Sequence, residues 1–559
     1  MRMNVNLTKF VSILNREQSS ILQAATVIML SVFGSRILGL LKYRLLAAHF
    51  GQSIDVLDSY IAASQIPEAI FEIIIFGAVS IAFIPIFSRY INLKNYSEGW
   101  KLASSMISLG LISYLILAII FFIFADFLAL IFAPGITADN PVLRSQVANL
   151  MRVMLFAQIF FVFSTFLTGV LQTFQRFLIP AIAAMVYNVG IILGIIFLSP
   201  YVGIYAPAWG MVLGAFLHLL IQIPISRQLG VKFSFKLLPI HPGALEIIRL
   251  SLPRTIALAA IKINDLVNIA LASLLSIGSI VAFNFAQVLI IMPLGLFGAS
   301  IAQAALPTMS LEAGKNELDN FKQTVISSLH QILFLIFPAS AILAILRIPA
   351  VRLVFGASNF PWDSTVLTGR IVIVLAFGLA AQASSLLLTR AFYAIKEAKT
   401  PVYINLTTIF INLFLSFIFV VVFKLSILFL AGAYAFSTIV NMLLLLYFLD
   451  SKVKFDNQKL IVPIIKMLVA TIGMAIALYV PMKLLDRLVF DTTRVFNLLI
   501  LTVIATGIGS LVYLIFAFIL DIYEVKVFTS LIAKRLPLKA PKQEEVIETA
   551  TPTPTTPTP

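Results

Sequence analysis

Long apolar runs alternate with short polar segments along most of this chain. A helix needs about 20 mostly apolar residues to cross a bilayer, and fourteen runs reach that length. We place these spans at approximately 24–48, 59–88, 103–125, 147–172, 178–199, 203–225, 250–276, 279–306, 324–346, 366–393, 402–423, 427–449, 461–482 and 496–520. The runs are continuous and lack the alternation of a membrane barrel. The pattern predicts an all-α polytopic membrane protein with fourteen transmembrane helices.

The composition agrees with a protein that is surrounded by lipid. Of its 559 residues, 60% are hydrophobic and 11% are charged, whereas soluble proteins average about 25% charged residues. The chain has no cysteine, which excludes disulfides and thiolate metal sites. It also lacks a Walker lysine loop, an HExxH motif, a nucleophile elbow and a dinucleotide fingerprint. We therefore expect that the protein is not an enzyme and has no metal site. Without an ATP site, any transport should be secondary or passive.

The basic residues are distributed unevenly between the two sides of the predicted membrane. If the N-terminus is placed inside, most of the 39 Lys and Arg lie in inside segments. This bias predicts that both termini are cytoplasmic. It also explains most of the net charge of +15 without a nucleic-acid partner. No small-residue cleavage site follows the polar N-terminus, so we expect no cleavable signal.

The two halves of the chain resemble each other weakly. The stretch 76–82 leads to Pro85 much as 297–302 leads to Pro307, with an offset of 222 residues between the prolines. The residues before Pro180 and Pro401 match at an offset of 221. Gly, Ala and Pro recur in any membrane helix, which is the alternative explanation. We favour two parallel six-helix lobes related by a pseudo-two-fold axis along the membrane normal, followed by two C-terminal helices.

This organisation divides the chain into six parts. They are a cytoplasmic N-terminal segment (1–23), an N-lobe (24–225), a basic cytoplasmic inter-lobe loop (226–249), a C-lobe (250–449), the last two helices (450–520) and a cytoplasmic tail (521–559). The tail is basic at first, which favours the inner membrane surface. It ends in a Pro- and Thr-rich stretch that we expect to be disordered.

Charged residues within the first two spans are candidate functional residues, because each costs roughly 2.5–3.5 kcal/mol at a helix centre. The first span carries Arg36, Lys42 and Arg44, which cannot share one stripe of a straight helix. Either a bend turns them inward, or Lys42 and Arg44 extend to the outer interface. The second span carries Asp58 at its outer end.

Further charges in the second and seventh spans suggest ion pairs inside the bundle. Glu68 and Glu72 lie one turn apart, opposite the basic first span, which suggests either pairing across a cavity or a purely structural contact. Lys262, Asp265 and Asn268 share a broad face of the seventh span. They form either a local Lys262–Asp265 pair or, with Asn412, a cation or proton site. An interior with several cations suits a large anionic substrate.

Several motifs in combination resemble the MurJ (MviN) lipid II flippases of the multidrug/oligosaccharidyl-lipid/polysaccharide (MOP) exporter superfamily. The resemblance covers residues from about 20 to about 520. The motifs are Ser35-Arg36-Ile37-Leu38-Gly39-Leu40-Leu41-Lys42, His49-Phe50-Gly51, Ile66-Pro67, Gly77-Ala78-Val79-Ser80-Ile81-Ala82-Phe83-Ile84-Pro85, Ala133-Pro134-Gly135 and Arg390-Ala391-Phe392-Tyr393-Ala394-Ile395-Lys396-Glu397-Ala398-Lys399-Thr400-Pro401.

The resemblance implies an activity, a location and partners. It implies a flippase that moves undecaprenyl-linked peptidoglycan precursor (lipid II) from the inner to the outer leaflet of the bacterial plasma membrane by alternating access. The driving force would be the membrane potential, a gradient of Na+ or H+, or the potential and an ion gradient together. No other cofactor is implied. The last two helices would form a groove for the lipid tail. The partners would be an undecaprenyl-pyrophosphate-linked glycopeptide, the lipid bilayer and the cell-wall synthesis machinery.

The resemblance also implies site residues, although the carry-over is partial. Arg36 and Lys42 match two cationic cavity positions, and Asp58 matches an acidic one. An arginine pair and a glutamate that are usual in the second helix of the family fall on Phe71, Glu72 and Phe76 here, and a cavity arginine of the eighth helix falls at about Val288. Arg44 and Lys262 could compensate for the missing arginines. The candidate substrate-binding residues are Arg36, Lys42, Arg44, Asp58, Glu68, Glu72 and Lys262. The candidate ion-binding residues are Asp265, Asn268 and Asn412.

Three other functions stay open from the sequence. One is a flippase for another undecaprenyl-linked oligosaccharide, of the O-antigen or capsule type. A second is a MATE-type drug/cation antiporter, for which we would expect twelve spans and an acid-dominated cavity. A third is a non-transporting scaffold that keeps the fold but has lost the cavity contacts.

Overall fold

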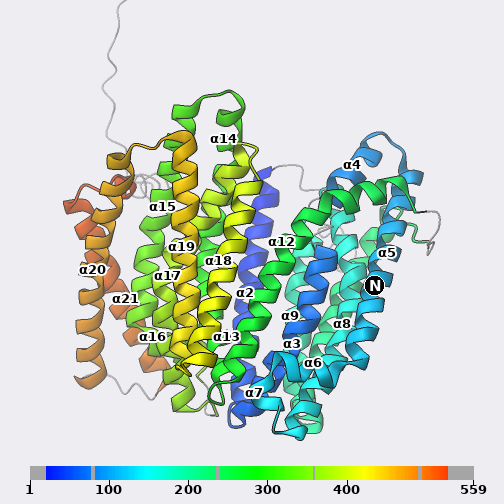
Figure 1. Ribbon diagram of the computed structural model, residues 1–559, viewed down its shortest axis with the longest axis horizontal. Helices are drawn as coiled ribbons and strands as arrows, with labels where there is room; N and C mark the ends of the chain where they lie inside the picture. Colours follow the sequence, from blue (N-terminus) through cyan, green and yellow to red (C-terminus); the bar gives the residue numbers. More distant parts are fainter. Residues whose placement is uncertain (1–20, 77–81, 235–239, 357–358, 489–493, 527–559) are drawn as a thin grey trace, which may run out of the picture.

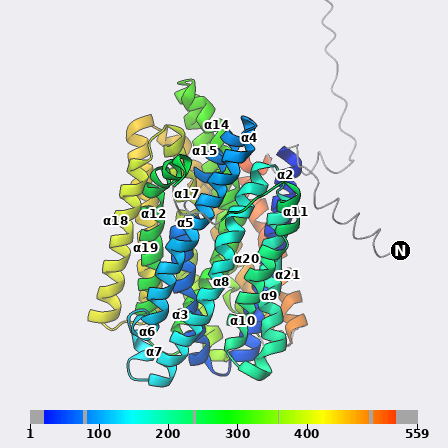
Figure 2. The same ribbon diagram turned by 90° about the vertical axis from the view of Figure 1, so that its right-hand side faces the viewer.

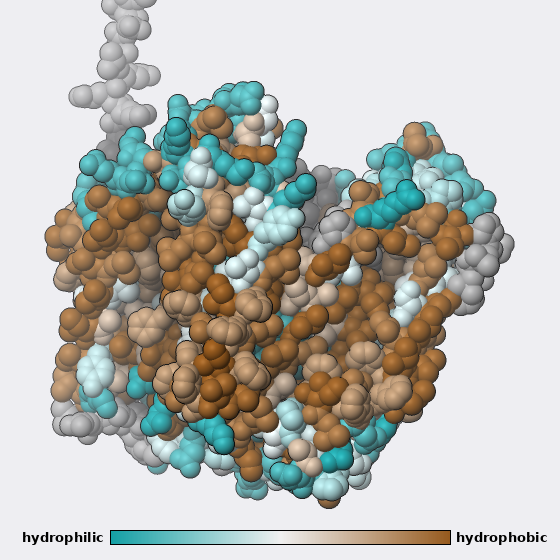
Figure 3. Space-filling model, viewed as in Figure 1, coloured by the Kyte–Doolittle hydropathy of each residue, from teal (hydrophilic) through white to brown (hydrophobic). Residues whose placement is uncertain are grey.

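The computed structural model describes residues 21–76, 82–234, 240–356, 359–488 and 494–526. Within these ranges the chain is helical and contains no β-strand, as predicted. Long helices run side by side in two views at right angles (Figures 1 and 2). Hydrophobic residues cover the middle of the face shown in Figure 3, while hydrophilic residues gather at its two ends. This distribution is the one expected of a bundle that crosses a bilayer.

The helices of the first lobe occupy the N-terminal part of the described chain. In it, α8 packs against α3, α5 and α10, and α9 packs against α2 and α10. The elements are α2 (Ile21–Phe50), α3 (Ile54–Phe71), the π-helical η1 (Glu72–Phe76), α4 (Ile84–Asn92), α5 (Tyr96–Ile123), α6 (Ala125–Phe132), α7 (Pro134–Thr137), α8 (Pro141–Thr173), α9 (Leu178–Val202), α10 (Tyr205–Leu220) and α11 (Ile223–Gln228).

The second lobe is built around α17, which packs against α13, α14, α15 and α19. The last two helices, α20 and α21, pack on each other and against α15 and α16. The elements are α12 (Pro242–Ser273), α13 (Ser279–Pro293), the π-helical η3 (Leu294–Ala299), α14 (Ser300–Gly314), α15 (Leu318–Ile345), α16 (Arg347–Val354), α17 (Trp362–Ala394), α18 (Lys399–Phe417), the π-helical η4 (Ile418–Val422), α19 (Ile427–Val453), α20 (Asn457–Leu488) and α21 (Val495–Ile519).

Every predicted span coincides with helix in the described ranges. Twelve helices there are long and apolar enough to cross a membrane. The helices at the first two predicted spans, α2 and α3 with η1, are not among these twelve, so the number fourteen stays a prediction. The expected N-terminal segment and most of the expected tail lie outside the described residues.

The backbone of the loops supports the internal repeat. Helices in both lobes end on residues with left-handed φ, and four such residues in the first lobe have counterparts 221 to 224 positions later. The π-helical segments η1 and η3 also begin 222 residues apart, at Glu72 and Leu294. Matching helix ends of this kind are a property of the fold and not of composition. The pairs are Lys94 with Asn316, Gln175 with Lys396, Gly203 with Lys424, and Gly230 with Lys454.

Two glycine pairs bring α9 and α10 into close contact. A Cβ added at Gly190 would lie 2.2 Å from the Cα of Gly214, and one added at Gly194 would lie 2.4 Å from the Cα of Gly210. Glycines four residues apart let two helix backbones approach in a membrane, where packing and not hydrophobicity holds helices together. The spacing of these glycines was visible in the sequence, but we did not predict the contact from it.

We expect Gly194→Ala to destabilise the first lobe, because its methyl group would meet backbone that can yield only if the two helices separate. Overpacking of this kind typically costs about 1–3 kcal/mol, so the midpoint of thermal unfolding in detergent should fall. Gly432→Ala is the matched control, because nothing lies within 4 Å of a Cβ at that position. Equal midpoints for the two variants would contradict the close packing.

Candidate functional site

The two lobes are joined at the end of the bundle that holds α6, α7 and α16, here called the α7 end (Figure 1). Asp58 of α3 is 1% exposed and caps the start of α13. Its Oδ2 accepts from the Gly278 amide at 2.6 Å, and its Oδ1 accepts from the Val281 amide at 2.8 Å. A carboxylate at this position satisfies free amides of the helix and complements the helix dipole. Asp58 therefore ties the first lobe to the second.

Other polar contacts reinforce the α7 end. Arg44 Nη1 donates to the Leu353 carbonyl at 2.7 Å, and the Gly135 amide donates to Ser273 Oγ at 3.0 Å. Arg44 and Asp58 were predicted to bind substrate. The structure places both in contacts between the lobes, and neither lines the cavities described below.

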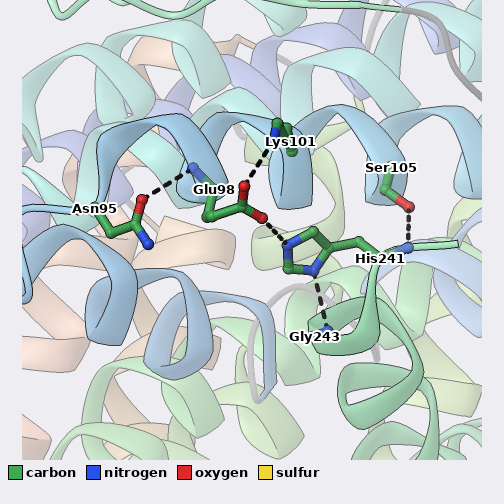
Figure 4. Close-up of polar contacts among 6 residues, drawn as sticks. All are labelled: Asn95, Glu98, Lys101, Ser105, His241 and Gly243. Atoms are coloured by element: carbon green, nitrogen blue, oxygen red, sulfur yellow. Dashed lines mark hydrogen bonds and ion pairs between the residues drawn. The ribbon is translucent and has the colours of Figure 1, made fainter. Parts of the chain in front are cut away.

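At the opposite end, here called the α4 end, the start of α12 is anchored to the first lobe (Figure 4). His241 Nδ1 accepts from the Gly243 amide, so Nε2 carries the proton and lies 3.2 Å from the Glu98 carboxylate. Lys101 also contacts this carboxylate, at 2.7 Å. Arg89 pairs with Glu246 at 2.6 Å one turn further along α12. The first helix of the second lobe is thus held by α4 and α5 of the first.

The second lobe has its own polar loops at the α4 end. Glu397 accepts hydrogen bonds from Lys452 and Thr400, and the Lys452 hydrogen bond holds the pKa of Glu397 below its usual value. The pKa of Asp456 is also lowered, first by its hydrogen bond from the Lys459 amide. Charged, well-bonded loops are expected where a bundle meets water.

Within the bundle, one ion pair crosses between the lobes. Lys262 Nζ of α12 lies 2.9 Å from Glu72 Oε2 in η1, and 3.9 Å from Asp265 Oδ2 on its own helix. The Lys262 and Glu72 side chains are 24% and 38% exposed, so both face open space. We predicted that Glu72 would pair with the first span. It pairs with the seventh instead, because η1 lies beside α12.

Two adjoining cavities open beside this pair. Glu68 lines both of them, a small one of about 30 Å³ together with Lys42, and a larger one of about 320 Å³ together with Glu72. The predicted residues that the structure brings together are therefore Lys42, Glu68, Glu72 and Lys262. Arg36 lies outside this group and donates to the Ile291 carbonyl of α13 at 3.3 Å, with its guanidinium against Gly295.

A third cavity, of about 380 Å³, lies in the second lobe among α12, α17, α18 and α19. Asp265 and Asn412 line it, as the predicted ion site requires. Asn412 Nδ2 donates to Asn264 Oδ1 at 2.8 Å and lies 3.4 Å from Asn268 Oδ1, so Asn268 stands behind the lining. Sequence reasoning missed Asn264 and also Asn405, which lies seven residues before Asn412 on the same helix face.

The lining of this third cavity is rich in oxygen. Carboxylate, amide and hydroxyl oxygens are the ligands of hard cations. Among the described residues, no group of three His, Cys, Asp or Glu could hold a metal ion. The oxygen-bearing lining groups are Asn264, Asp265, Gln382, Ser385, Thr389, Tyr393, Asn405, Thr408, Asn412, Tyr434, Ser437, Thr438 and Asn441, and one cation, Arg390, also lines the cavity.

Two helical lobes with charged cavities at membrane depth define a multi-pass membrane transporter. The sequence model of the family "Lipid II flippase MurJ" matches residues 46–529. The probable lipid II flippase MurJ of Thermotoga maritima is 32% identical over 391 residues, which cover 70% of this chain and 77% of the relative. The lipid II flippase MurJ of Burkholderia cenocepacia is 25% identical over 392 residues, covering 69% and 76%.

Solved structures agree with the sequence comparison. A structure titled "Lipid II flippase MurJ, inward closed conformation" superimposes with a TM-score of 0.74 at 26% identity, over 91% of this chain and 100% of that one. An inward-facing MATE transporter of the MOP superfamily gives a TM-score of 0.61 at 16% identity, over 75% and 94%, which is a likeness of fold alone. The chain belongs to the lipid II flippase MurJ family, and the resemblance seen in its sequence is confirmed.

Proposed function

We propose that this chain translocates lipid II, an undecaprenyl-pyrophosphate-linked glycopeptide, from the inner to the outer leaflet of the bacterial plasma membrane. Membership of the MurJ family supports this function. The observation that carries it is the Lys262–Glu72 pair, which joins the two lobes and holds a cation beside an open cavity of the first lobe. A pyrophosphate that crosses a bilayer needs such a cation. No observation favours the other lipid-linked oligosaccharides, drug transport or a scaffold.

The geometry suggests how the two lobes could alternate. In this state, contacts made by Asp58 and Arg44 close the α7 end, which the distribution of basic residues places outside the cell. The headgroup would enter from the cytoplasmic α4 end, and its phosphates would take Lys262 away from Glu72. Release at the outer leaflet would require the α7 contacts to break. The lipid tail would stay in the bilayer against α20 and α21.

The oxygen-lined cavity of the second lobe supports coupling to a cation. Asp265 offers a carboxylate and Asn412 an amide there, and Asp265 also lies within 3.9 Å of Lys262. A Na+ or H+ bound at Asp265 would therefore change the charge that faces the substrate site. The membrane potential adds about 2.3 kcal/mol per charge per 100 mV. Enzymes that make and use cell-wall precursor would act before and after this step.

We expect Asp265→Asn to remove the dependence of translocation on the coupling cation, because a neutral amide can neither ionise nor balance Na+. Rates would be measured with a Na+ gradient at fixed pH and with a pH gradient at fixed Na+. Asp319→Asn is the control, because that carboxylate belongs to the α4 end and its side chain is 97% exposed. If Asp265→Asn keeps the wild-type response to both gradients, the ion site is elsewhere.

The function itself is tested in a bacterium depleted of its own lipid II flippase. We expect this chain to restore growth and the appearance of lipid II in the outer leaflet. Correctly inserted protein that restores neither would argue for a different lipid-linked substrate.

A further inference from the structure

The larger cavity of the first lobe has aromatic walls. It lies among α3, η1, α8, α9 and α10 and is lined in part by Phe71, Phe161 and Tyr187. The Phe161 ring packs edge to face against Tyr187, with centroids 4.8 Å apart, and lies tilted against Phe71, with centroids 5.6 Å apart. The faces of such rings carry partial negative charge, which attracts cations.

Two polar side chains in this cavity, Gln158 and Glu68, lack partners among the described residues, whereas Glu72 is paired with Lys262. Gln158 is 2% exposed and lines the cavity, yet its amide makes no hydrogen bond with any described residue. Glu68 forms no ion pair or hydrogen bond with a described residue either, although Lys42 lines the adjoining small cavity. In that small cavity the buried Oδ1 of Asn284 is also without a partner. The buried Asn284 oxygen is costly without a donor, while Glu68 and Gln158 face the open cavity and can accept hydrogen bonds from a ligand.

The two lysines near the cavity have other contacts. Lys262 is held by Glu72, and the Nζ of Lys42 lies 4.5 Å from the centroid of the Tyr43 ring. Neither lysine comes within ion-pair distance of Glu68. Glu68 therefore lies in the field of Lys42 and Lys262 but forms a direct ion pair with neither, and its carboxylate stays open to a further cation.

We propose that this cavity binds a primary ammonium group at the end of a flexible aliphatic chain. Glu68 would pair with the ammonium, Gln158 would accept one of its hydrogens, and Phe161 and Tyr187 would surround it. A volume of about 320 Å³ admits such a side chain. In one respect the inference rests on the proposed function: in a lipid II flippase, the group would be the free side-chain amine of a diamino acid in the headgroup peptide.

This assignment gives the headgroup two points of recognition with opposite charge. Lys262 serves the pyrophosphate, and Glu68 serves the amine. The two sites lie on either side of Glu72, which lines the ammonium cavity and pairs with Lys262. A headgroup without the amine would leave the Glu68 carboxylate buried and unpaired when the site closes.

The test measures binding to the full-length protein in lipid nanodiscs. The probes are lipid II with a lysine in its peptide and the same molecule with the lysine amine acetylated. We expect acetylation to weaken binding about tenfold, as the loss of one desolvated cation–π and charge contact predicts. Glu68→Gln should reduce that difference to within about twofold, and Phe161→Leu should reduce it partly. Asp319→Asn should leave it unchanged. Equal affinities of wild type for the two probes would overturn the inference.

A second measurement separates this inference from the proposed function. Millimolar n-butylammonium should raise the thermal unfolding midpoint of wild type but not that of Glu68→Gln. If neither lipid II probe binds while n-butylammonium still stabilises wild type selectively, the proposed substrate is wrong and the ammonium site stands. If n-butylammonium stabilises both proteins equally or neither, the ammonium site is wrong, whatever the lipid does. The unfolding curves also report whether Glu68→Gln is folded.

Discussion

We expect replacement of Lys262 with glutamine to lower lipid II translocation by at least about tenfold. The change removes the cation that faces the cavity and leaves Glu72 without its partner 2.9 Å away. Breaking a fully buried pair costs about 3–5 kcal/mol. Partial exposure reduces this figure here, and about 1.4 kcal/mol already gives a factor of ten. The measurement is the fraction of lipid II that reaches the outer leaflet of flippase-depleted cells.

A second variant separates the two causes of this loss. Lys262→Gln combined with Glu72→Gln removes the stranded carboxylate but does not restore the cation. We expect the double variant to recover the stability lost in the single variant while translocation stays low. Full recovery of translocation would mean that Lys262 only neutralises Glu72 and does not contact substrate.

We expect Asp58→Ala to open the α7 end. The substitution removes both hydrogen bonds to the start of α13 and leaves buried amides without an acceptor. Hydrogen bonds to a charged group are worth about 1.5–3 kcal/mol, so the population of the open form should rise by a factor of roughly 10 or more. Spin labels on cysteines at Gln52 and Asn359, whose side chains are hydrogen-bonded across the lobes, report this as a shift to longer distances. The chain has no other cysteine.

Asp55→Ala is the matched control for this experiment. Asp55 lies one turn earlier on α3, and its side chain makes none of the contacts to α13. It should leave the distance distribution unchanged. An unchanged distribution in Asp58→Ala as well would mean that other contacts hold the α7 end closed.

The fold could be predicted from the sequence because lipid sets a simple rule for helix length. The predicted span 178–199 and the observed α9 (Leu178–Val202) agree at their start. The repeat was visible only in short motifs, yet the left-handed helix ends at Lys94 and Asn316 show that it shapes the backbone. The single continuous helix predicted at 59–88 was wrong in detail, because its described part divides into α3, η1 and the start of α4.

The site could be predicted only in part. A charged residue inside a membrane span is energetically costly and is therefore a candidate functional residue. Glu72, Lys262 and Asp58 were selected for this reason. Their partners were not predictable, because helical periodicity relates residues on one helix and not on two. Glu72 and Lys262 are 190 positions apart, and Asp58 contacts an amide 220 positions away. Gln158 is a neutral residue in an apolar run, so its position in a cavity could not be predicted from the sequence.

The central claim is that lipid II crosses the membrane between the two lobes of this protein. The most direct measurement is the rate at which fluorescent lipid II changes leaflet in liposomes that contain the purified chain and nothing else. We predict faster exchange than in protein-free liposomes, and a loss of most of this increase when the lobes are cross-linked through cysteines at Gln52 and Asn359. Exchange that is no faster with protein than without it, or that is unaffected by the cross-link, would contradict the claim.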